Sequence, residues 1–235
     1  MTTTTPFSRR FLFGALLLLP LLTGIGKAHA GPDVASLVEN GCDACHRLEA
    51  SIPEEGRKGP DLFFSGNKFQ KQWLLNWLQS PQPVRPSGYT SDPGFLEGKP
   101  TVAVPHPAAD APEAQALTEA LMQMKVEGLE TAPPEVAEPL SKGLRFKIKI
   151  LFERDYGCIA CHQTVNLVGE PRGGVSGPTL LNAGDRLQAE WVYNWLKTPA
   201  RFEPKSRMPV FDLTEEERIQ LTRYVMWHKT EKEEK

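Results

Sequence analysis

The sequence predicts an all-α protein built from two tandem copies of one domain. Three observations support this: short motifs recur at a nearly constant spacing, pairs of tryptophans are spaced for one helix face, and no segment alternates like a half-buried strand. The chain has 235 residues, of which 40% are hydrophobic and 24% charged, which is ordinary for a globular protein. We expect domains at residues 31–127 and 141–235, joined by a Pro-rich linker at residues 128–140.

Residues 1–30 have the features of a cleavable export signal. Arg9 and Arg10 precede an apolar stretch of 15 residues, and Ala28-His29-Ala30 is a small-x-small cleavage site. This stretch is shorter than the roughly 20 residues that span a bilayer, so we expect cleavage before Gly31, with an uncleaved anchor as the alternative. The two arginines also resemble part of a twin-arginine signal, but the very apolar stretch favours export of an unfolded chain. The sequence therefore predicts a periplasmic protein.

The net charge excludes one class of function. Cleavage would remove three basic residues and no acid, leaving 24 bases against 29 acids and a net charge of −5. A protein of this charge is not expected to bind nucleic acid, and a partner that docks on its bulk surface should be locally basic.

Four motifs recur in the two halves. Their positions are Cys-x-x-Cys-His at 42–46 and 158–162, Gly-Pro at 59–60 and 177–178, Trp-x-x-x-Trp at 73–77 and 191–195, and a single proline at 81 and 199. The first motif has an offset of 116 and the other three have an offset of 118, which indicates a duplicated domain. We expect helices at 70–78 and 188–196 around the tryptophans, a helix with apolar positions 144, 148, 151 and 152, and a helix that starts at a capping box, Thr214 to Glu217.

The Cys-x-x-Cys-His motif is typical of the covalent attachment of a c-type haem. The thiols would be Cys42, Cys45, Cys158 and Cys161, and the proximal iron ligands would be His46 and His162. A zinc site would need a further pair of ligands in each half, a redox-active dithiol would need a βαβ unit, and a disulfide would not explain the histidines. The sequence therefore predicts two covalently bound c-type haems.

Each half resembles a mitochondrial-type (class I) cytochrome c domain in the order of its motifs: haem motif, Gly-Pro-x-Leu, tryptophan helix, ligand loop and C-terminal helix. The resemblance implies that the carbonyl of Pro60 orients His46, and that the carbonyl of Pro178 orients His162. Prolines that merely end a turn are the alternative.

In the second half, Met208 resembles the distal ligand of the Met-Pro loop of this family, and Met226 competes with it. The first half has no Met-Pro. Counting back from the C-terminal helices at an offset of 102 aligns Met208 with His106, after an insertion of 16 residues. We expect His106 to be the distal ligand of the first haem, with Met122, Met124 or an open position as alternatives.

Two further pairs are candidates for the haem environment. The tryptophans belong to the core and could also wall the haem edge. Lys68 and Arg186 occupy matching positions, where they could contact haem propionates.

An iron with two protein ligands has no free position for a substrate, so the resemblance implies electron transfer between redox partners, as a carrier or as a subunit of a larger redox complex. Met/His ligation raises the reduction potential above that of two histidines, so electrons would pass from the first haem to the second. The alternatives are a dihaem enzyme, peroxidase-like or a sulfur-compound oxidoreductase, with an open or displaceable ligand, and a haem-bearing docking module.

Overall fold

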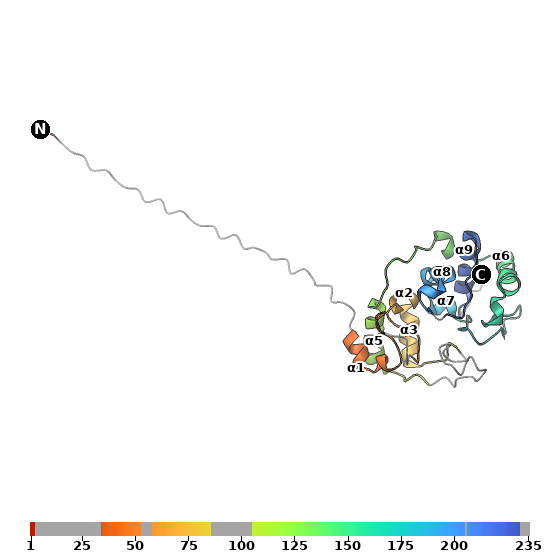
Figure 1. Cartoon of the computed structure of the whole chain (residues 1–235), viewed down its shortest axis with the longest axis horizontal. Helices are drawn as coiled ribbons and strands as arrows, with labels where there is room; N and C mark the ends of the chain where they lie inside the picture. The colour runs from red at the N-terminus through yellow and green to blue at the C-terminus, as the bar shows by residue number, and fades with distance from the viewer. Residues whose placement is uncertain (3–33, 53–57, 86–104, 205, 231–235) are drawn as a thin grey trace. The chain divides into compact units, whose positions relative to one another are not determined.

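The computed structural model describes residues 1–2, 34–52, 58–85, 105–204 and 206–230. The expected export signal and most of the insertion before His106 lie outside these residues. Gly31–Lys235 form one compact unit (Figure 1). Among the described residues, no helix is both long enough and apolar enough to cross a membrane.

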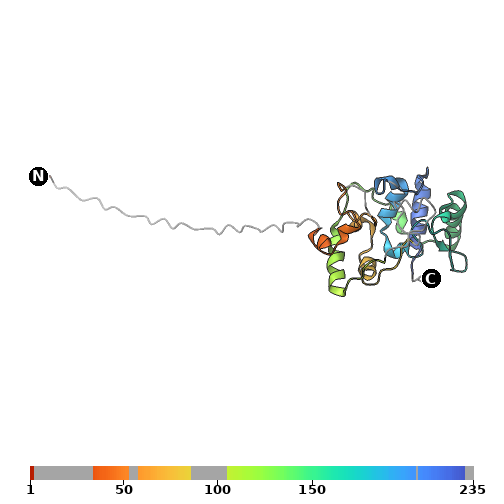
Figure 2. The same ribbon diagram turned by 60° about the horizontal axis from the view of Figure 1, so that its bottom comes forward.

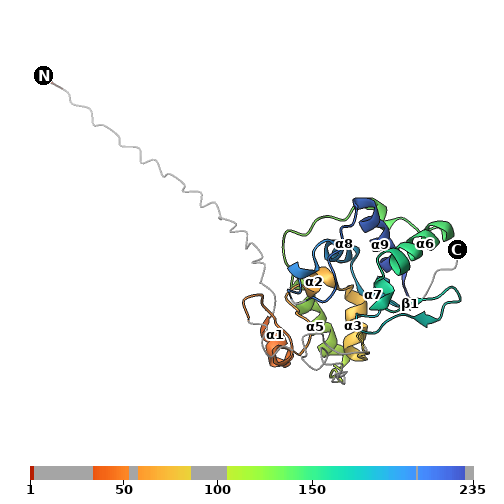
Figure 3. The ribbon, with the colours of Figure 1, turned by 45° about the vertical axis from the view of Figure 1, so that its right-hand side comes forward.

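The two halves contain similar elements in the same order. The first half contains α1 (Val34–Glu39), a 3-10 turn (Cys42–Ala44), α2 (Ser65–Lys68), α3 (Lys71–Gln79) and α5 (Ala111–Gln123). The second half contains α6 (Lys142–Ile150), which continues as a π-helical turn (Leu151–Asp155), then a 3-10 turn (Cys158–Ala160), α7 (Ala183–Arg186), α8 (Ala189–Lys197), a 3-10 turn (Pro199–Arg201) and α9 (Glu215–Trp227). Helices α1, α3 and α5 lie together, and so do α6, α8 and α9 (Figures 1 to 3). The described residues are therefore helix-rich, as the sequence predicts.

The two tryptophan helices form where the spacing predicts them. In α3, Leu74 and Leu78 are buried one turn apart, and in α8 Trp191 and Leu196 are buried. Both helices begin after a glutamine in extended conformation and end two residues before the repeated proline. This proline cannot continue the hydrogen-bond ladder, which explains why both helices are nine residues long.

The structure also confirms the expected start of α9 and two buried positions of the expected apolar stripe in α6 and the turn after it. The Thr214 hydroxyl accepts a hydrogen bond from the Glu217 amide, and the Glu217 carboxylate accepts one from the Thr214 amide at 2.8 Å, which completes the capping box of α9. In α6 and the turn after it, Ile148 and Phe152 are fully buried, as their spacing predicts.

The register expected for the C-terminal helices was wrong by two residues. Helix α5 starts at Ala111 after its N-cap Asp110, and α9 starts at Glu215 after its N-cap Thr214, so equivalent residues differ by 104 rather than 102. The sequence comparison paired two aspartates, but Asp and Thr serve equally as N-caps. His106 is therefore not the residue equivalent to Met208, and its candidacy depends on its position in space.

A short hairpin that the sequence did not predict follows the second haem motif. Strands β1 (Thr164–Val165) and β2 (Pro171–Arg172) pair antiparallel, with Thr164 opposite Arg172. The Asn166 side chain closes the loop by accepting hydrogen bonds from the amides of Val168 and Glu170 at 2.9 Å. Strands of two residues are too short to give an alternating pattern, which is why sequence periodicity does not reveal them.

The two halves meet through matching segments around α2 and α7. The Gln70 amide donates to the carbonyl of Arg186 at 2.8 Å, and the Gln188 amide donates to the carbonyl of Lys68 at 2.9 Å. Phe69 and Leu187 form an antiparallel bridge between these bonds. Each segment thus contacts its own equivalent, which is the pattern of an isologous interface.

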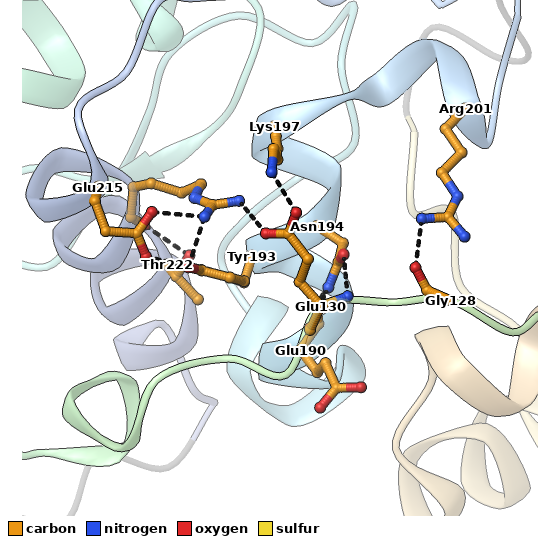
Figure 4. Close-up of polar contacts among 10 residues, drawn as sticks. Gly128, Glu130, Glu190, Tyr193, Asn194, Lys197, Arg201, Glu215 and Thr222 are labelled. Carbon is orange, nitrogen blue, oxygen red and sulfur yellow. Dashed lines mark hydrogen bonds and ion pairs between the residues drawn. The ribbon is translucent and has the colours of Figure 1, made fainter.

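The linker is held against the second half (Figure 4). The Asn194 side chain exchanges two hydrogen bonds with the backbone of Glu130, both at 2.8 Å. The Glu130 carboxylate contacts Lys197 and, at 3.1 Å, Arg218, and these two cations lower the pKa of Glu130. These contacts hold the linker at Glu130 against α8 and α9.

Two glycines allow each short helix to contact a C-terminal helix directly. The Gly66 amide donates to the Met124 carbonyl, and the Gly184 amide donates to the His228 carbonyl, both at 2.8 Å. A Cβ at Gly184 would collide with the backbone carbonyl of Met226. Since a backbone carbonyl cannot move aside like the end of a side chain, glycine is required there.

We expect Gly184→Ala to lower the free energy of unfolding by about 1–3 kcal/mol, because the added methyl group separates α7 from α9. Denaturant unfolding followed by circular dichroism measures the change. Gly143→Ala in α6 is the control: nothing lies within 4 Å of the added Cβ, so this change should stabilise the protein by about 0.5–1 kcal/mol. Equal effects of the two substitutions would contradict the packing described here.

Candidate functional site

Each Cys-x-x-Cys-His motif forms a tight helical turn. A glycine with positive φ starts the turn, Gly41 at 71° and Gly157 at 61°. The His46 amide donates to the Cys42 carbonyl at 2.9 Å, and the His162 amide donates to the Cys158 carbonyl at 3.0 Å. This winding places the two thiols and the histidine of each motif along one side of the turn.

None of the four cysteines forms a disulfide in the structure. Cys42, Cys45 and Cys158 are half-buried and Cys161 is exposed. Burial is the main cause that raises the pKa of Cys42, and burial raises the pKa of Cys158 to about 11. Among the described residues, no three His, Cys, Asp or Glu side chains come together as a metal-binding group.

The two histidines of the motifs are oriented in the same way. Nδ1 of His46 lies 2.6 Å from the carbonyl oxygen of Pro60, and Nδ1 of His162 lies 2.8 Å from that of Pro178. Because a carbonyl only accepts, Nδ1 must carry the hydrogen, which leaves the lone pair on Nε2 of each ring. These are the contacts that the resemblance implies for the two prolines, and they leave Nε2 as the nitrogen able to bind a metal.

The glycine before each of these prolines leaves room for the imidazole. A Cβ at Gly177 would lie 2.7 Å from Cε1 of His162, and a Cβ at Gly59 would collide with the His46 ring. Burial lowers the pKa of both histidines, and the proline carbonyl opposes this effect. In the Gly-Pro motif, the glycine thus leaves space for the imidazole ring, and the proline carbonyl accepts the hydrogen bond that orients it.

His106 lies across from His46. Their ring centroids are 6.2 Å apart, and the ring planes are inclined by 50°. An iron ion bound on opposite sides by two imidazole nitrogens, each about 2 Å away, would separate the ring centroids by about 6 Å. Nδ1 of His106 lies 2.8 Å from the Pro107 carbonyl, so its Nε2 also keeps a lone pair. The geometry of this pair fits a haem iron with two histidine ligands.

Met208 lies beside the tryptophan helix of the second half. The Trp195 ring nitrogen donates a hydrogen bond to the Met208 sulfur at 3.0 Å, and Met208 is half-buried against the core. This bond orients the thioether and leaves it capable of binding a soft metal ion. In the first half, the equivalent Trp77 packs against the His106 ring at 4.7 Å between centroids. Each second tryptophan therefore contacts a candidate distal ligand.

The alternative methionines occupy packing positions. Met122 and Met226 are equivalent in α5 and α9, and a Cβ at Gly66 or Gly184 would collide with their backbone carbonyls. Met124 is 3% exposed and follows α5 directly. The structure brings the ring of His106 to that of His46.

Lys68 and Arg186 lie between the halves. The Lys68 ammonium is 5.8 Å from the ring of Trp191, and the Arg186 guanidinium is 6.0 Å from the ring of Trp73, so each cation faces a tryptophan of the other half. Burial is the main cause that lowers the pKa of Lys68 to about 7, and repulsion from Arg186 adds to it. Arg186 is therefore buried and Lys68 is partly buried at the contact between the halves.

Sequence reasoning missed the ion pair that supports the first histidine. Arg47 donates two hydrogen bonds to the Asp61 carboxylate, at 2.8 Å and 2.5 Å, and both side chains are buried. Arg47 follows His46 in the sequence, and Asp61 follows Pro60. The ion pair therefore joins the same two segments as the hydrogen bond between His46 and Pro60. The sequence signal for this ion pair was a basic residue directly after the motif histidine and an acidic residue directly after the motif proline. The second half has Gln163 and Thr179 at these places.

Residues 147–229 match the family model of cytochrome c. The matched segment contains Cys158, Cys161, His162 and Met208, and a cytochrome c domain implies covalently bound haem c and electron transfer. The comparisons with curated proteins and with solved structures gave no match. The second half of the chain thus contains a cytochrome c domain, and the repeated geometry of the first half is an observation independent of this match.

We expect Met208→Ala to abolish the far-red absorption band between thioether sulfur and ferric iron, and to lower one reduction potential, because a thioether favours ferrous iron. Optical spectroscopy and a redox titration measure both changes. Met226→Leu, which conserves side-chain volume within α9, should leave the band in place. Survival of the band in Met208→Ala would assign the ligand to Met226 instead.

Proposed function

We propose that the chain is an exported dihaem cytochrome c that transfers electrons between redox partners. The observation that carries this proposal is that the first half, outside the matched family segment, repeats the His46, Pro60 and Gly59 arrangement of the second half. In each half a carbonyl fixes the tautomer of the histidine, and a glycine leaves space for its ring. This arrangement is typical of a histidine that binds a metal through Nε2. Its presence twice supports two cytochrome c domains in tandem.

The residues around each site would hold the two haems in different ways. Cys42 and Cys45 would attach the first haem through thioether bonds, and His46 and His106 would bind its iron. In the second site, Cys158 and Cys161 would attach the haem, and His162 and Met208 would bind its iron. Haem supplies a centre that gains and loses one electron, and an iron held by two side chains would have no free position for a substrate. This ligation favours a carrier, or a subunit of a larger redox complex, over a dihaem enzyme.

The ligands also imply a direction of transfer. A site with two histidines holds its electron less tightly than a site with histidine and methionine. The first half would therefore receive the electron from a donor and pass it to the second half. Lys68 and Arg186 lie at the contact between the halves, where their charges would be compensated by the propionates of the haems.

The proposed location and the proposed partners rest on the sequence alone. The basic, apolar and small-residue segments of residues 1–30 support export to the periplasm, where haem attachment to an unfolded chain takes place. The net negative charge of the cleaved chain supports partners with basic docking surfaces. These partners are redox proteins, and contact with a membrane would occur only through a partner or through an uncleaved signal segment.

The haem count of two variants tests the proposal. Replacing both cysteines of the first motif (Cys42→Ala with Cys45→Ala), or both cysteines of the second motif (Cys158→Ala with Cys161→Ala), should reduce the covalently bound haem from two per chain to one in a pyridine haemochrome assay, because no thioether bond can then form at that site. A wild-type chain with one haem, or a variant without Cys42 and Cys45 that retains every haem of the wild type, would contradict a first haem site. The variant without all four cysteines is the control and should lack covalently bound haem.

A further inference from the structure

A groove in the second half lies between α6 with its π-helical turn and the hairpin of β1 and β2. It has a volume of about 320 Å³, and its lining includes the apolar side chains of Phe146 and Leu167. Phe146 is 53% exposed, and Leu167 and Val168 in the hairpin loop are 78% and 79% exposed. Large apolar side chains that are this exposed around one groove are typical of a surface that a partner covers.

The walls of the groove are fixed to each other and to the second Cys-x-x-Cys-His motif. The Lys149 ammonium donates to the carbonyl of Val165 in β1 at 2.8 Å, which joins α6 to the hairpin. After β2, the Gly174 amide donates to the carbonyl of Ile159, inside the motif, at 2.9 Å. The groove is therefore a preformed surface next to the proposed second haem site.

Positive charge surrounds the groove. The acid among its lining residues, Glu153, is paired with Lys149 at 2.5 Å and lies 3.6 Å from Arg172. Arg154 also lines the groove and is exposed. Lys147 is exposed as well, and its spacing of seven residues from Arg154 places both on one side of this helical segment. The cations thus outnumber the one acid of the groove.

This charge differs from that of the chain as a whole. Residues 142–155 contain five bases and two acids, whereas α1, at the corresponding place in the first half, contains one acid and no base. Over the expected domains, residues 31–127 have 8 bases and 13 acids, a net charge of −5, and residues 141–235 have 16 bases and 13 acids, a net charge of +3. A partner of the second half is therefore an exception to the basic partners expected for the bulk surface, and its own docking surface should be acidic.

We propose that this groove is the docking site of an acidic redox protein, which accepts the electron from the second half. The inference rests on the proposed function, in which the electron leaves the chain from the second haem. One electron would pass to the partner, which is reduced as the haem is oxidised, with no bond made or broken. Complementary charge would steer the partner to the groove, and Phe146 and Leu167 would contact it once it docks. A groove with fixed walls fits a protruding segment of a folded partner better than it fits a lipid surface.

Binding of an acidic plastocyanin, a small blue-copper protein that accepts one electron, tests this proposal. Biolayer interferometry with the oxidised, haem-loaded chain measures association and dissociation rates without electron transfer. Lys147→Glu with Arg154→Glu should lower the association rate about tenfold at low ionic strength and much less in 1 M salt, since salt screens exposed charges. Leu167→Ser with Val168→Ser should speed dissociation and leave the salt dependence of association as in the wild-type protein.

The matched control is Lys71→Glu with Lys125→Glu, which makes the same change of net charge at two exposed lysines of the first half. Its association rate should stay close to that of the wild-type protein. Absence of salt-dependent binding by the wild-type protein, or an equal loss of binding in both charge-reversal variants, would overturn the docking site. The same holds if Lys147→Glu with Arg154→Glu abolishes binding to phosphatidylglycerol vesicles, or self-association of the chain, and leaves plastocyanin binding intact.

The haem count and the far-red band of each variant separate this inference from the proposed function. Two haems, a normal band and plastocyanin binding that does not respond to the groove variants would reject the docking site alone. A wild-type chain with one haem would reject the proposed function.

Discussion

The hydrogen bond from Nδ1 of a motif histidine to a proline carbonyl is the constraint on which both sites depend. It selects the tautomer and directs Nε2 of His46 and His162 away from the anchoring turn. Glycine must precede each proline, because a methyl group there would occupy the space of the imidazole. The Cys-x-x-Cys turn and the Gly-Pro turn are thus arranged around one fixed ring in each half, and in the first half His106 lies beside that ring.

The duplication keeps this constraint and varies what supports it. In the first half the anchoring turn is closed by the Arg47–Asp61 pair, and in the second half it is secured by Arg186 and by the backbone of Val84. The distal residues differ as well, since His106 packs on one tryptophan and Met208 accepts a hydrogen bond from the other. Two similar folds therefore provide two electrostatically different sites, which is what directional electron transfer requires.

The sequence predicted the local features well, because each depends on a few neighbouring residues. Tryptophan spacing located α3 and α8, and the Thr214 capping box located the start of α9. The register of His106 was wrong by two residues, since helix caps rather than matching acids define the equivalence. The approach of Val84 to the turn at Thr179 could not be predicted, because it depends on how the halves pack and no periodicity encodes that contact.

The central claim is that the first half holds a haem between His46 and His106, and electron paramagnetic resonance of the ferric protein tests it most directly. The 6.2 Å separation of their rings is the geometric basis of the claim. We expect a low-spin signal with two nitrogen ligands in the wild-type protein, beside the signal of the haem bound by histidine and methionine. In His106→Ala this signal should be replaced by a high-spin signal, with the second haem unaffected. An unchanged spectrum in His106→Ala would contradict the claim and would make His106 a surface histidine.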